Sequence, residues 1–593
     1  MTKQELLELK NKILQLKKIN ETENLLPKTT AYSFLVECSK DRLDSVAINY
    51  LGRTITYREL IEKIDNTAKA YAELGIKKGQ RVGMSMLMTP EATISFYALN
   101  KLGATAKLIN ITHNTDELAS DLESLTSDVF ITHDIFYSKN ISEVVDKTQV
   151  NKVVLSSLVD SLPYGFYGDM IKYNAITKLQ GIRNRSAIND GKCINWKDLY
   201  KKGEESTINV EPEFISGAPI AIASTSGTTG KSKGVVTTND AINAVPVQMG
   251  MTDETFAPND SIFTTLPTWI YYSLVNNMHV PLCLGVTLNM DPLFNPKQIH
   301  KRLKQYEFNH WNTIPAYVDD MVKDKKLKNM NLSFLKSITT GGDFLTPKLK
   351  KEAEVKLKEN NSDIYVGQGY GASEILGSFG YTYEPEKSEG TIGKPLVGNR
   401  YKILDLDTKE EVGVNQTGEM YLYSPALMKE YDFNEEATNE SIVTDKNGVR
   451  WYKTGDLAHY DENGELFIDG RIRRIELTKD DKGLPTKIFP DKIKGVILQH
   501  PSVEKCEVIM VDDEIRMKKP VCFIVLKDGI EFTKDIVDDI NQICLENKLE
   551  RYSIPVEYKN IEEIPLTPGL KTDYNELQKI YAEPADNQRR KML

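Results

Sequence analysis

Along the first 210 residues of the chain, segments with the helical spacing of apolar residues alternate with short, strand-like apolar runs. Residues 56–75 (TYRELIEKIDNTAKAYAELG) repeat apolar side chains at helical spacing and end at Gly75. The apolar run RVGMSML from Arg81 is typical of a strand, and PEATISFYALNKLGA from Pro90 predicts the next helix. This alternation of helix and strand predicts a mostly parallel sheet covered by helices.

The pattern changes twice further along the chain. From Glu389 to Asp469 the apolar segments become shorter and are separated by Gly, Asn and Asp, which favours β structure. The tail after Arg473 contains the strand candidates KCEVIMV and PVCFIVL and the helical stretch FTKDIVDDINQICLENKL. Residues 160–205 have little periodicity, so we expect an excursion between core elements and assign it no catalytic role.

The N-terminal segment predicts an amphipathic helix, because Leu6, Leu9, Ile13 and Leu16 share one helical face. Two heptads are too short to indicate a coiled coil, and we expect this helix to pack on its own domain. Charges interrupt the segment throughout, and an apolar run of about 18 residues occurs nowhere. We therefore expect a cytoplasmic protein without membrane insertion.

Length and net charge limit which classes of protein and partner fit this chain. A chain of 593 residues can bury a large core, and its net charge of −10 gives no electrostatic case for nucleic acid as a partner. The scattered cysteines form no CxxC pair and no zinc spacing, so we interpret them as reduced core thiols. They are Cys38, Cys193, Cys283, Cys506, Cys522 and Cys544.

The segment 224–236 (STSGTTGKSKGVV) carries the strongest chemical signal. Its glycines allow consecutive backbone N–H groups to point inward, and its hydroxyls and lysines add partners for phosphate oxygens. A flexible linker is the alternative, but the flanking runs PIAIA and GVV place the segment between candidate strands. The segment is not a P-loop, because that motif has four residues between its first glycine and its Gly-Lys pair and would require glycine where Thr225 stands.

The same segment resembles the signature TSGTTGxPKG of adenylate-forming enzymes, the superfamily that includes acyl- and aryl-CoA synthetases. Ser232 stands where the signature has proline. Further segments resemble family motifs in the family's order and cover the chain from Thr56 to Tyr574: TYREL, TTGGDFLTP, YGASE, TGEMYLYSP, YKTGDLA, GRIRR and IPLTPGLKTDY.

The resemblance implies an α/β fold with a large multi-lobed N-terminal domain over residues 1–472. This domain would hold two α/β lobes with parallel-type sheets and a small β lobe. A small mobile α+β domain over residues 473–593 would carry the catalytic lysine. The implied activity is that of an acid–thiol ligase, an AMP-forming acyl-CoA synthetase, which uses ATP, Mg²⁺ and CoA and acts through an acyl-adenylate with release of pyrophosphate.

The resemblance also assigns roles to individual residues. Lys571 would be catalytic, and Arg473 would lie at the hinge. Glu374 would bind Mg²⁺, as suits a hard cation, together with the hydroxyl of Thr228. The ATP phosphates would be held by Thr225, Ser226, Gly227, Thr228, Thr229, Gly230 and Lys233. Adenine and ribose would be held by Gly341, Gly342, Asp343, Tyr370, Gly371, Ser373, Asp456 and Arg471.

Three features depart from the family pattern or leave the reaction open. Leu570 stands where a glycine normally precedes the catalytic lysine, and Arg473 replaces the usual Asp or Lys of the hinge. A histidine often follows the aromatic residue of the acyl-site motif, but Ile270 follows Trp269 here. Candidate walls of the acyl pocket favour an apolar aliphatic or aromatic acid; they are Trp269, Tyr272, Val275, Thr313 and Tyr317.

Two alternative functions remain at this point. In the first, the activated acid is transferred to the phosphopantetheine of a separate carrier protein instead of CoA. A catalytically weak nucleotide-binding sensor is the other alternative, although Glu374, Asp456, Arg471 and Lys571 are all present. The sequence leaves open whether the protein is a monomer or a homodimer.

Overall fold

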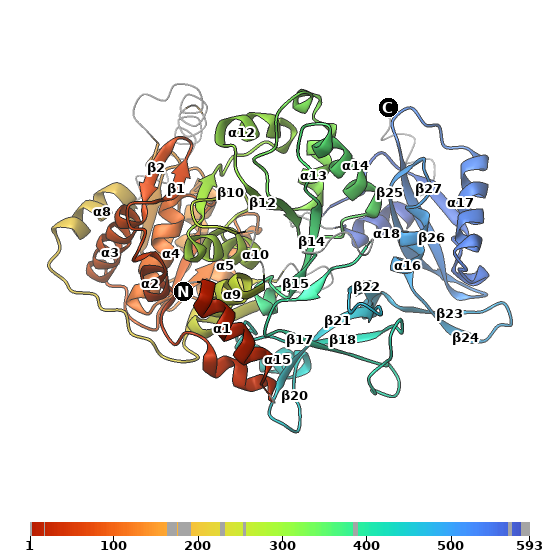
Figure 1. The fold of residues 1–593 in the computed structure, drawn as a ribbon, viewed down its shortest axis with the longest axis horizontal. Helices are drawn as coiled ribbons and strands as arrows, with labels where there is room; N and C mark the ends of the chain where they lie inside the picture. The colour runs from red at the N-terminus through yellow and green to blue at the C-terminus, as the bar shows by residue number, and fades with distance from the viewer. Residues whose placement is uncertain are drawn as a thin grey trace. The chain divides into compact units, whose positions relative to one another are not determined.

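The computed structural model describes residues 3–16, 18–162, 175, 191–225, 232–252, 256–382, 390–566 and 572–582 (Figure 1). The chain forms two compact units. The first comprises Met1–Thr225, Ser232–Tyr401 and Leu422–Tyr452, and the described residues of the second lie in Lys402–Tyr421 and Lys453–Leu593. The predicted domain boundary at residue 473 stays a prediction.

The first unit contains an eight-stranded sheet that is parallel through its centre and antiparallel at one edge. Its strands, in spatial order, are β19 (Glu430–Tyr431), β9 (Gly234–Thr238), β8 (Pro219–Ser224), β4 (Thr105–Leu108), β3 (Arg81–Ser85), β5 (Val129–His133), β6 (Lys152–Ser156) and β7 (Cys193–Asn195).

The same unit contains a second sheet, which has nine strands and is also parallel through its centre. Its strands, in spatial order, are β16 (Lys394–Pro395), β15 (Gly380–Tyr381), β14 (Val366–Tyr370), β13 (Ser337–Thr340), β12 (His310–Thr313), β10 (Ser261–Thr264), β11 (Thr287–Met290), β1 (Val46–Tyr50) and β2 (Arg53–Thr56). The prediction of two parallel-type α/β lobes is therefore confirmed.

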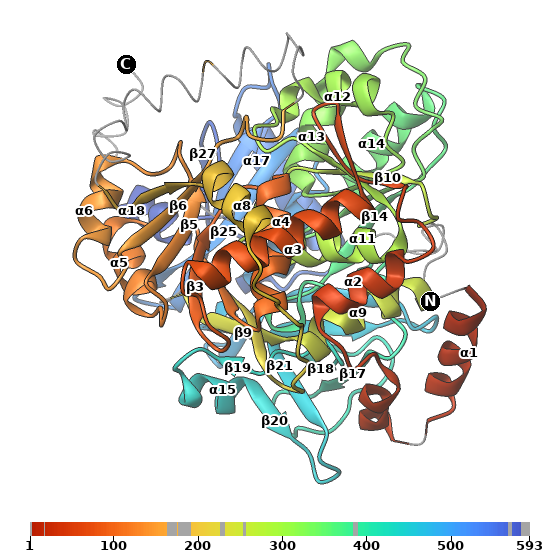
Figure 2. The same ribbon diagram turned by 90° about the vertical axis from the view of Figure 1, so that its left-hand side faces the viewer.

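Helices cover these sheets, and α3, α4 and α8 lie side by side (Figure 2). The helices of the first unit are α1 (Lys3–Leu14), α2 (Ala31–Ser39), α3 (Tyr57–Glu73), α4 (Pro90–Leu102), α5 (Thr115–Glu123), α6 (Lys139–Val145), α8 (Trp196–Glu205), α9 (Asn239–Thr252), α10 (Tyr271–Leu274), α11 (Val280–Leu284), α12 (Ile299–Tyr306), α13 (Pro315–Lys323), α14 (Pro347–Lys358) and α15 (Glu435–Ser441).

Local sequence signals explain where the predicted helices begin and end. Thr56 and Glu59 form a reciprocal capping box at the start of α3, and Gly75 follows its end with φ +100°. The helix α4 starts at Pro90 after the cap Thr89 and ends at Gly103, which is left-handed with φ +73°. Both predicted helices are thus confirmed.

The two less regular segments also have defined places. The helix α1 buries Leu9 and Ile13 in a cluster with α9 residues such as Val247 and Met251, as expected for a helix packed on its own domain. The end of the expected excursion belongs to the core architecture instead: β7 extends the eight-stranded sheet, and α8 packs against α3.

Strands β17 (Arg400–Leu404), β18 (Gly418–Tyr423) and β21 (Arg450–Tyr460) each run from one unit into the other. Strand β20 (Ile442–Thr444) pairs with the start of β21, and β22 (Leu466–Arg471) pairs with its end. This region confirms the short β segments that the sequence predicted.

The second unit ends in a small α+β body. Strands β25 (Val503–Asp513), β26 (Met517–Leu526) and β27 (Glu557–Asn560) form its sheet. Its other elements are the hairpin β23 (Glu476–Lys479) and β24 (Pro485–Ile488) and the helices α16 (Pro490–Ile497), α17 (Lys534–Glu546) and α18 (Tyr574–Ala582). Its core is separate and gathers Cys506, Cys522 and Cys544 among aliphatic residues. Both strands and the helix predicted in the tail are confirmed.

Candidate active site

The segment predicted to bind phosphate joins two antiparallel strands, β8 and β9, which pair Ser224 with Gly234. The backbone N–H of Thr225 donates to the carbonyl of Lys233 (2.8 Å), and the N–H of Lys233 donates to Thr225 Oγ1 (3.1 Å). Ser232 Oγ donates to the carbonyl of Thr225 (2.5 Å). These bonds define the neck of the loop; Ser226, Gly227, Thr228, Thr229 and Gly230 lie outside the described residues.

Glu374, the predicted metal ligand, lies in a short 3₁₀ turn after β14 and is 7% exposed. Tyr431, which is 4% exposed, donates its hydroxyl to Glu374 Oε1 (2.5 Å). The N–H of Met428 donates to the Glu374 carbonyl (2.7 Å), so the backbone of this turn is fixed as well. The carboxylate is therefore held from a segment more than fifty positions away in the sequence.

Tyr431 also connects Glu374 with the phosphate-loop neck. In the sheet it pairs with Val235 of β9, and Lys233 Nζ lies 4.7 Å from its ring centroid. Burial and the nearby charge of Glu374 raise the pKa of Tyr431 far above its ordinary value, so the phenol remains a hydrogen-bond donor. Reasoning from the sequence missed this residue, because nothing in its local pattern marks the contact.

The residues predicted to bind adenine lie at the carboxyl ends of two adjacent parallel strands, β13 and β14. Gly341 and Gly342 follow β13, with Gly342 at φ +81°, and Asp343 is exposed beside them. Tyr370 ends β14 with its ring edge-on to Phe379. This edge of an open parallel sheet is the usual position of ligand sites in α/β folds.

The glycines at this edge allow close approach. A Cβ on Gly341 would lie 3.1 Å from the Tyr272 ring, and a Cβ on Gly371 would lie 2.2 Å from the carbonyl carbon of Gly377. Ser373, two residues after Gly371, opens the turn that carries Glu374. Any side chain at Gly371 would therefore displace backbone next to the predicted metal ligand.

The structure separates the five candidates for the acyl pocket. Tyr272 lies against Gly341, and its Oη lies 3.4 Å from the carbonyl oxygen of Thr313. Val275 is buried in a π-helical turn that continues α10, and Trp269 is half-buried in the preceding turn. Tyr317 lies edge-on to Phe294 and packs against the core cluster that contains Trp311 of β12; its role as a pocket wall stays a prediction.

Asp456 and Arg471, the predicted ribose ligands, are neighbours in the second unit. They face each other across β21 and β22, with Arg471 Nε 2.6 Å from Asp456 Oδ1. Asp456 is buried, whereas the Arg471 side chain is 46% exposed. An aspartate with one oxygen paired with an arginine retains acceptor capacity for hydroxyl groups.

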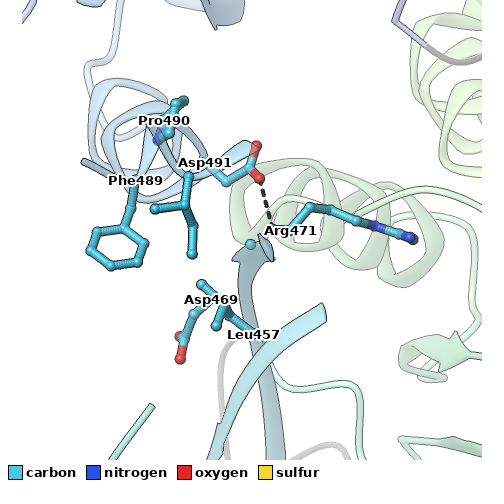
Figure 3. Close-up of a pocket in the computed structure, with 8 residues that line it drawn as sticks. Leu457, Asp469, Arg471, Phe489, Pro490 and Asp491 are labelled. Carbon is cyan, nitrogen blue, oxygen red and sulfur yellow. Dashed lines mark hydrogen bonds between the residues drawn. The ribbon is translucent and has the colours of Figure 1, made fainter. Parts of the chain in front are cut away.

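Immediately after Arg471 the chain turns through the 3₁₀ segment Ile472–Arg474, which contains the predicted hinge residue Arg473. The Asp491 carboxylate accepts a hydrogen bond from the N–H of Arg471 (3.2 Å) and lines a narrow recess with Phe489 and Pro490 (Figure 3). In this view the Arg471 side chain extends away from the recess. Lys571 lies outside the described residues.

The sequence matches the model of the family described as "AMP-binding enzyme" over residues 35–432, and that of "AMP-binding enzyme C-terminal domain" over residues 492–571. The chain belongs to the AMP-binding enzyme family. The resemblance to adenylate-forming enzymes is thus confirmed.

Relatives of this AMP-binding enzyme include acid–CoA ligases at low identity. It is 26% identical to 4-coumarate–CoA ligase 4 of Arabidopsis thaliana over 82% of this chain and 80% of the relative. It is 24% identical to a long-chain-fatty-acid–CoA ligase of Bacillus subtilis (strain 168) over 91% of this chain and 93% of the relative. The chain is therefore a member of the group that contains acid–CoA ligases.

Solved structures confirm the fold. The anthranilate CoA ligase AuaEII in complex with anthranoyl-AMP matches with a TM-score of 0.74 and 20% identity, over 94% of this chain and 98% of that one. ATP-bound MatB from Rhodopseudomonas palustris matches with a TM-score of 0.74 and 19% identity, over 93% and 99%. Across the described residues, every helix is too short or too polar to cross a membrane.

Proposed function

We propose that this AMP-binding enzyme is an ATP- and Mg²⁺-dependent carboxylic acid:CoA ligase that acts through an acyl-adenylate. The observation that carries the proposal is the connection of Glu374 and Lys233 through Tyr431 at the neck of the phosphate loop. A buried carboxylate and an ammonium group held next to a glycine-rich loop match the needs of a metal-bound polyphosphate.

In the first step, a carboxylate oxygen of the acid attacks the α-phosphorus of ATP, and the bond to the bridging oxygen of pyrophosphate breaks. Both reactants are anions, so the protein must neutralise charge and align them. Lys233 and the loop from Thr225 would hold the phosphates. Lys571 is proposed to place its ammonium group at the carboxylate and the α-phosphate, where charge shifts during the attack.

The donor set fits a magnesium ion, because one carboxylate, that of Glu374, together with a hydroxyl such as that of Thr228 suits a cation that is otherwise bound by phosphate oxygens. When bound, Mg²⁺ neutralises phosphate charge and orients the leaving group. Asp456 would accept hydrogen bonds from the ribose hydroxyls while Arg471 keeps it oriented. Adenine would lie at the edge formed by Gly341 and Tyr370.

In the second step, the thiol sulfur of CoA attacks the acyl carbon, the bond to AMP breaks and the thiol proton passes to solvent. CoA is preferred to a carrier protein because the curated relatives reported above are named as CoA ligases. For the acid, we propose an apolar aliphatic or aromatic carboxylate. Tyr272 beside Gly341 supplies an aromatic wall at the nucleotide edge.

Acid-dependent exchange of pyrophosphate into ATP tests the first step. A panel of aliphatic and aromatic acids should contain at least one that supports exchange, and no exchange with any acid would favour a nucleotide sensor. Adding CoA or a phosphopantetheinylated carrier protein and weighing the thioester by mass spectrometry then identifies the acceptor. Thioester formed on the carrier protein alone would replace the CoA assignment.

A further inference from the structure

A buried carboxylate in the second unit collects three donors. Glu507 of β25 is 3% exposed. Its Oε1 accepts from Lys494 Nζ (2.5 Å) and Thr572 Oγ1 (2.8 Å), and its Oε2 accepts from Tyr574 Oη (3.0 Å). These donors come from α16 and from the residues at and just before the start of α18, so the carboxylate fixes separate segments to β25, an edge strand of the small sheet.

Thr572 directly follows Lys571 in the sequence. It forms a β-bridge with Leu566, and the N–H of Asp573 donates to the carbonyl of Pro565 (2.8 Å). The described residues that precede and follow 567–571 therefore lie next to each other. Glu507 holds the returning end by a side-chain bond to the residue next to the proposed catalytic lysine.

The same group of residues reaches the turn that carries the predicted hinge. Arg474 donates through Nη1 to Tyr574 Oη (2.6 Å) and through Nη2 to the carbonyl of Val508 (2.8 Å), and it also pairs with Asp491. Its guanidinium lies 4.1 Å from the Tyr574 ring centroid. Arg474 and Glu507 thus hold the same tyrosine from two directions.

Hydrophobic packing alone would not require this arrangement. Burial would raise the pKa of Glu507, but the charges of Lys494 and Arg474 and the hydrogen bond from Thr572 outweigh burial and hold it below its ordinary value. The group is therefore an ionised, fully engaged buried carboxylate. Replacing buried ion pairs by apolar residues of similar size is often neutral or stabilising, so stability alone does not account for this group.

We propose that Glu507, acting through Thr572 and Tyr574, is a positioning residue for Lys571 in the adenylation step, with Arg474 linking this contact to the hinge turn. The inference rests on the proposed function, in which Lys571 acts when acid attacks ATP. It assigns Glu507 no contact with substrate. The bonds that it accepts hold Thr572 and Tyr574, which follow Lys571 in the sequence.

The test separates the two half-reactions in the full-length protein. Glu507→Gln should lower the rate of acid-dependent pyrophosphate exchange by roughly 10- to 100-fold, the scale for a small misplacement of a reacting group, with KM for ATP within about twofold of wild type. Thioester formation from supplied acyl-adenylate and CoA should stay near the wild-type rate. Glu563→Gln, the same change at an exposed glutamate before the loop, is the matched control.

Equal losses in both half-reactions would show general damage to the domain and would overturn the proposal, as would wild-type exchange by Glu507→Gln. If that variant fails to fold, Tyr574→Phe removes one hydroxyl and keeps the ring under Arg474. It should slow exchange roughly three- to tenfold and leave the thioester step unchanged. Absence of exchange in the wild-type enzyme would count against the proposed function itself.

Discussion

The hydroxyl of Tyr431 can be removed while its ring is kept. Tyr431→Phe deletes the donor that lies 2.5 Å from Glu374 Oε1 and preserves the surface under Lys233. Because both residues are buried, water does not readily replace the lost bond. The Glu374 carboxylate then loses the hydrogen bond that joins it to Tyr431, the residue whose ring also contacts Lys233.

The size of the effect follows from the type of bond. A hydrogen bond to a charged group contributes about 1.5–3 kcal/mol. A loss of about 2 kcal/mol at a metal ligand corresponds to roughly 30-fold weaker binding, within the 10- to 100-fold range typical of residues that orient ligands. We expect the Mg²⁺ concentration for half-maximal activity to rise by about this factor in Tyr431→Phe.

The assay is acid-dependent pyrophosphate exchange at fixed ATP with Mg²⁺ titrated. Tyr421→Phe is a matched control, because the Tyr421 hydroxyl also donates to a buried glutamate, Glu419 (3.3 Å), and Lys402 lies over its ring. The control should titrate like the wild type. An unchanged Mg²⁺ requirement in Tyr431→Phe would refute the role of the Tyr431–Glu374 bond.

Three further outcomes are expected. Lys571→Ala should slow adenylation by on the order of a hundredfold or more, and near-normal exchange would remove the catalytic assignment. Gly371→Ala should lower the free energy of unfolding by about 1–3 kcal/mol, because its methyl would meet the Gly377 backbone, whereas Gly495→Ala meets nothing within 4 Å; thermal unfolding compares them. Burial and, to a smaller extent, the charge of Asp160 raise the pKa of Glu91 in the folded protein to about 7. The contribution of Glu91 to the free energy of unfolding is therefore most favourable below its unfolded-state pKa and declines as the pH rises through 7. Glu91→Gln should therefore gain up to about 3 kcal/mol over wild type at pH 8 and much less at pH 5, and equal urea midpoints of the two proteins at pH 8 would contradict this.

Features encoded within a short window were predictable from the sequence. The capping box at Thr56 and the left-handed glycine at Gly103 mark helix ends by chemistry that acts over four residues. The phosphate segment was placed between strands because its flanks are continuous apolar runs. Strand pairing and helix boundaries of this kind need no knowledge of the distant chain.

Contacts between distant segments were not predictable in this way. Tyr431 meets Glu374 across 57 positions, and nothing near either residue indicates the other. Tyr317 of α13 lies edge-on to Phe294, and nothing in its local pattern indicates that partner. The strand β7 has only three residues, so its period of two is too short to detect, and its pairing with β6 decides its conformation.

The packing of α1 on α9 sets an order of events during synthesis. The first helix ends at Leu14, but its partner begins only at Asn239. At about 5–20 residues per second, the ribosome needs roughly 10–45 seconds to make the intervening 225 residues or so. For that time the apolar face of α1 lacks Val247 and Met251 and has only neighbours made earlier, such as Leu26 and Phe34, so its packing is completed only after α9 has been made.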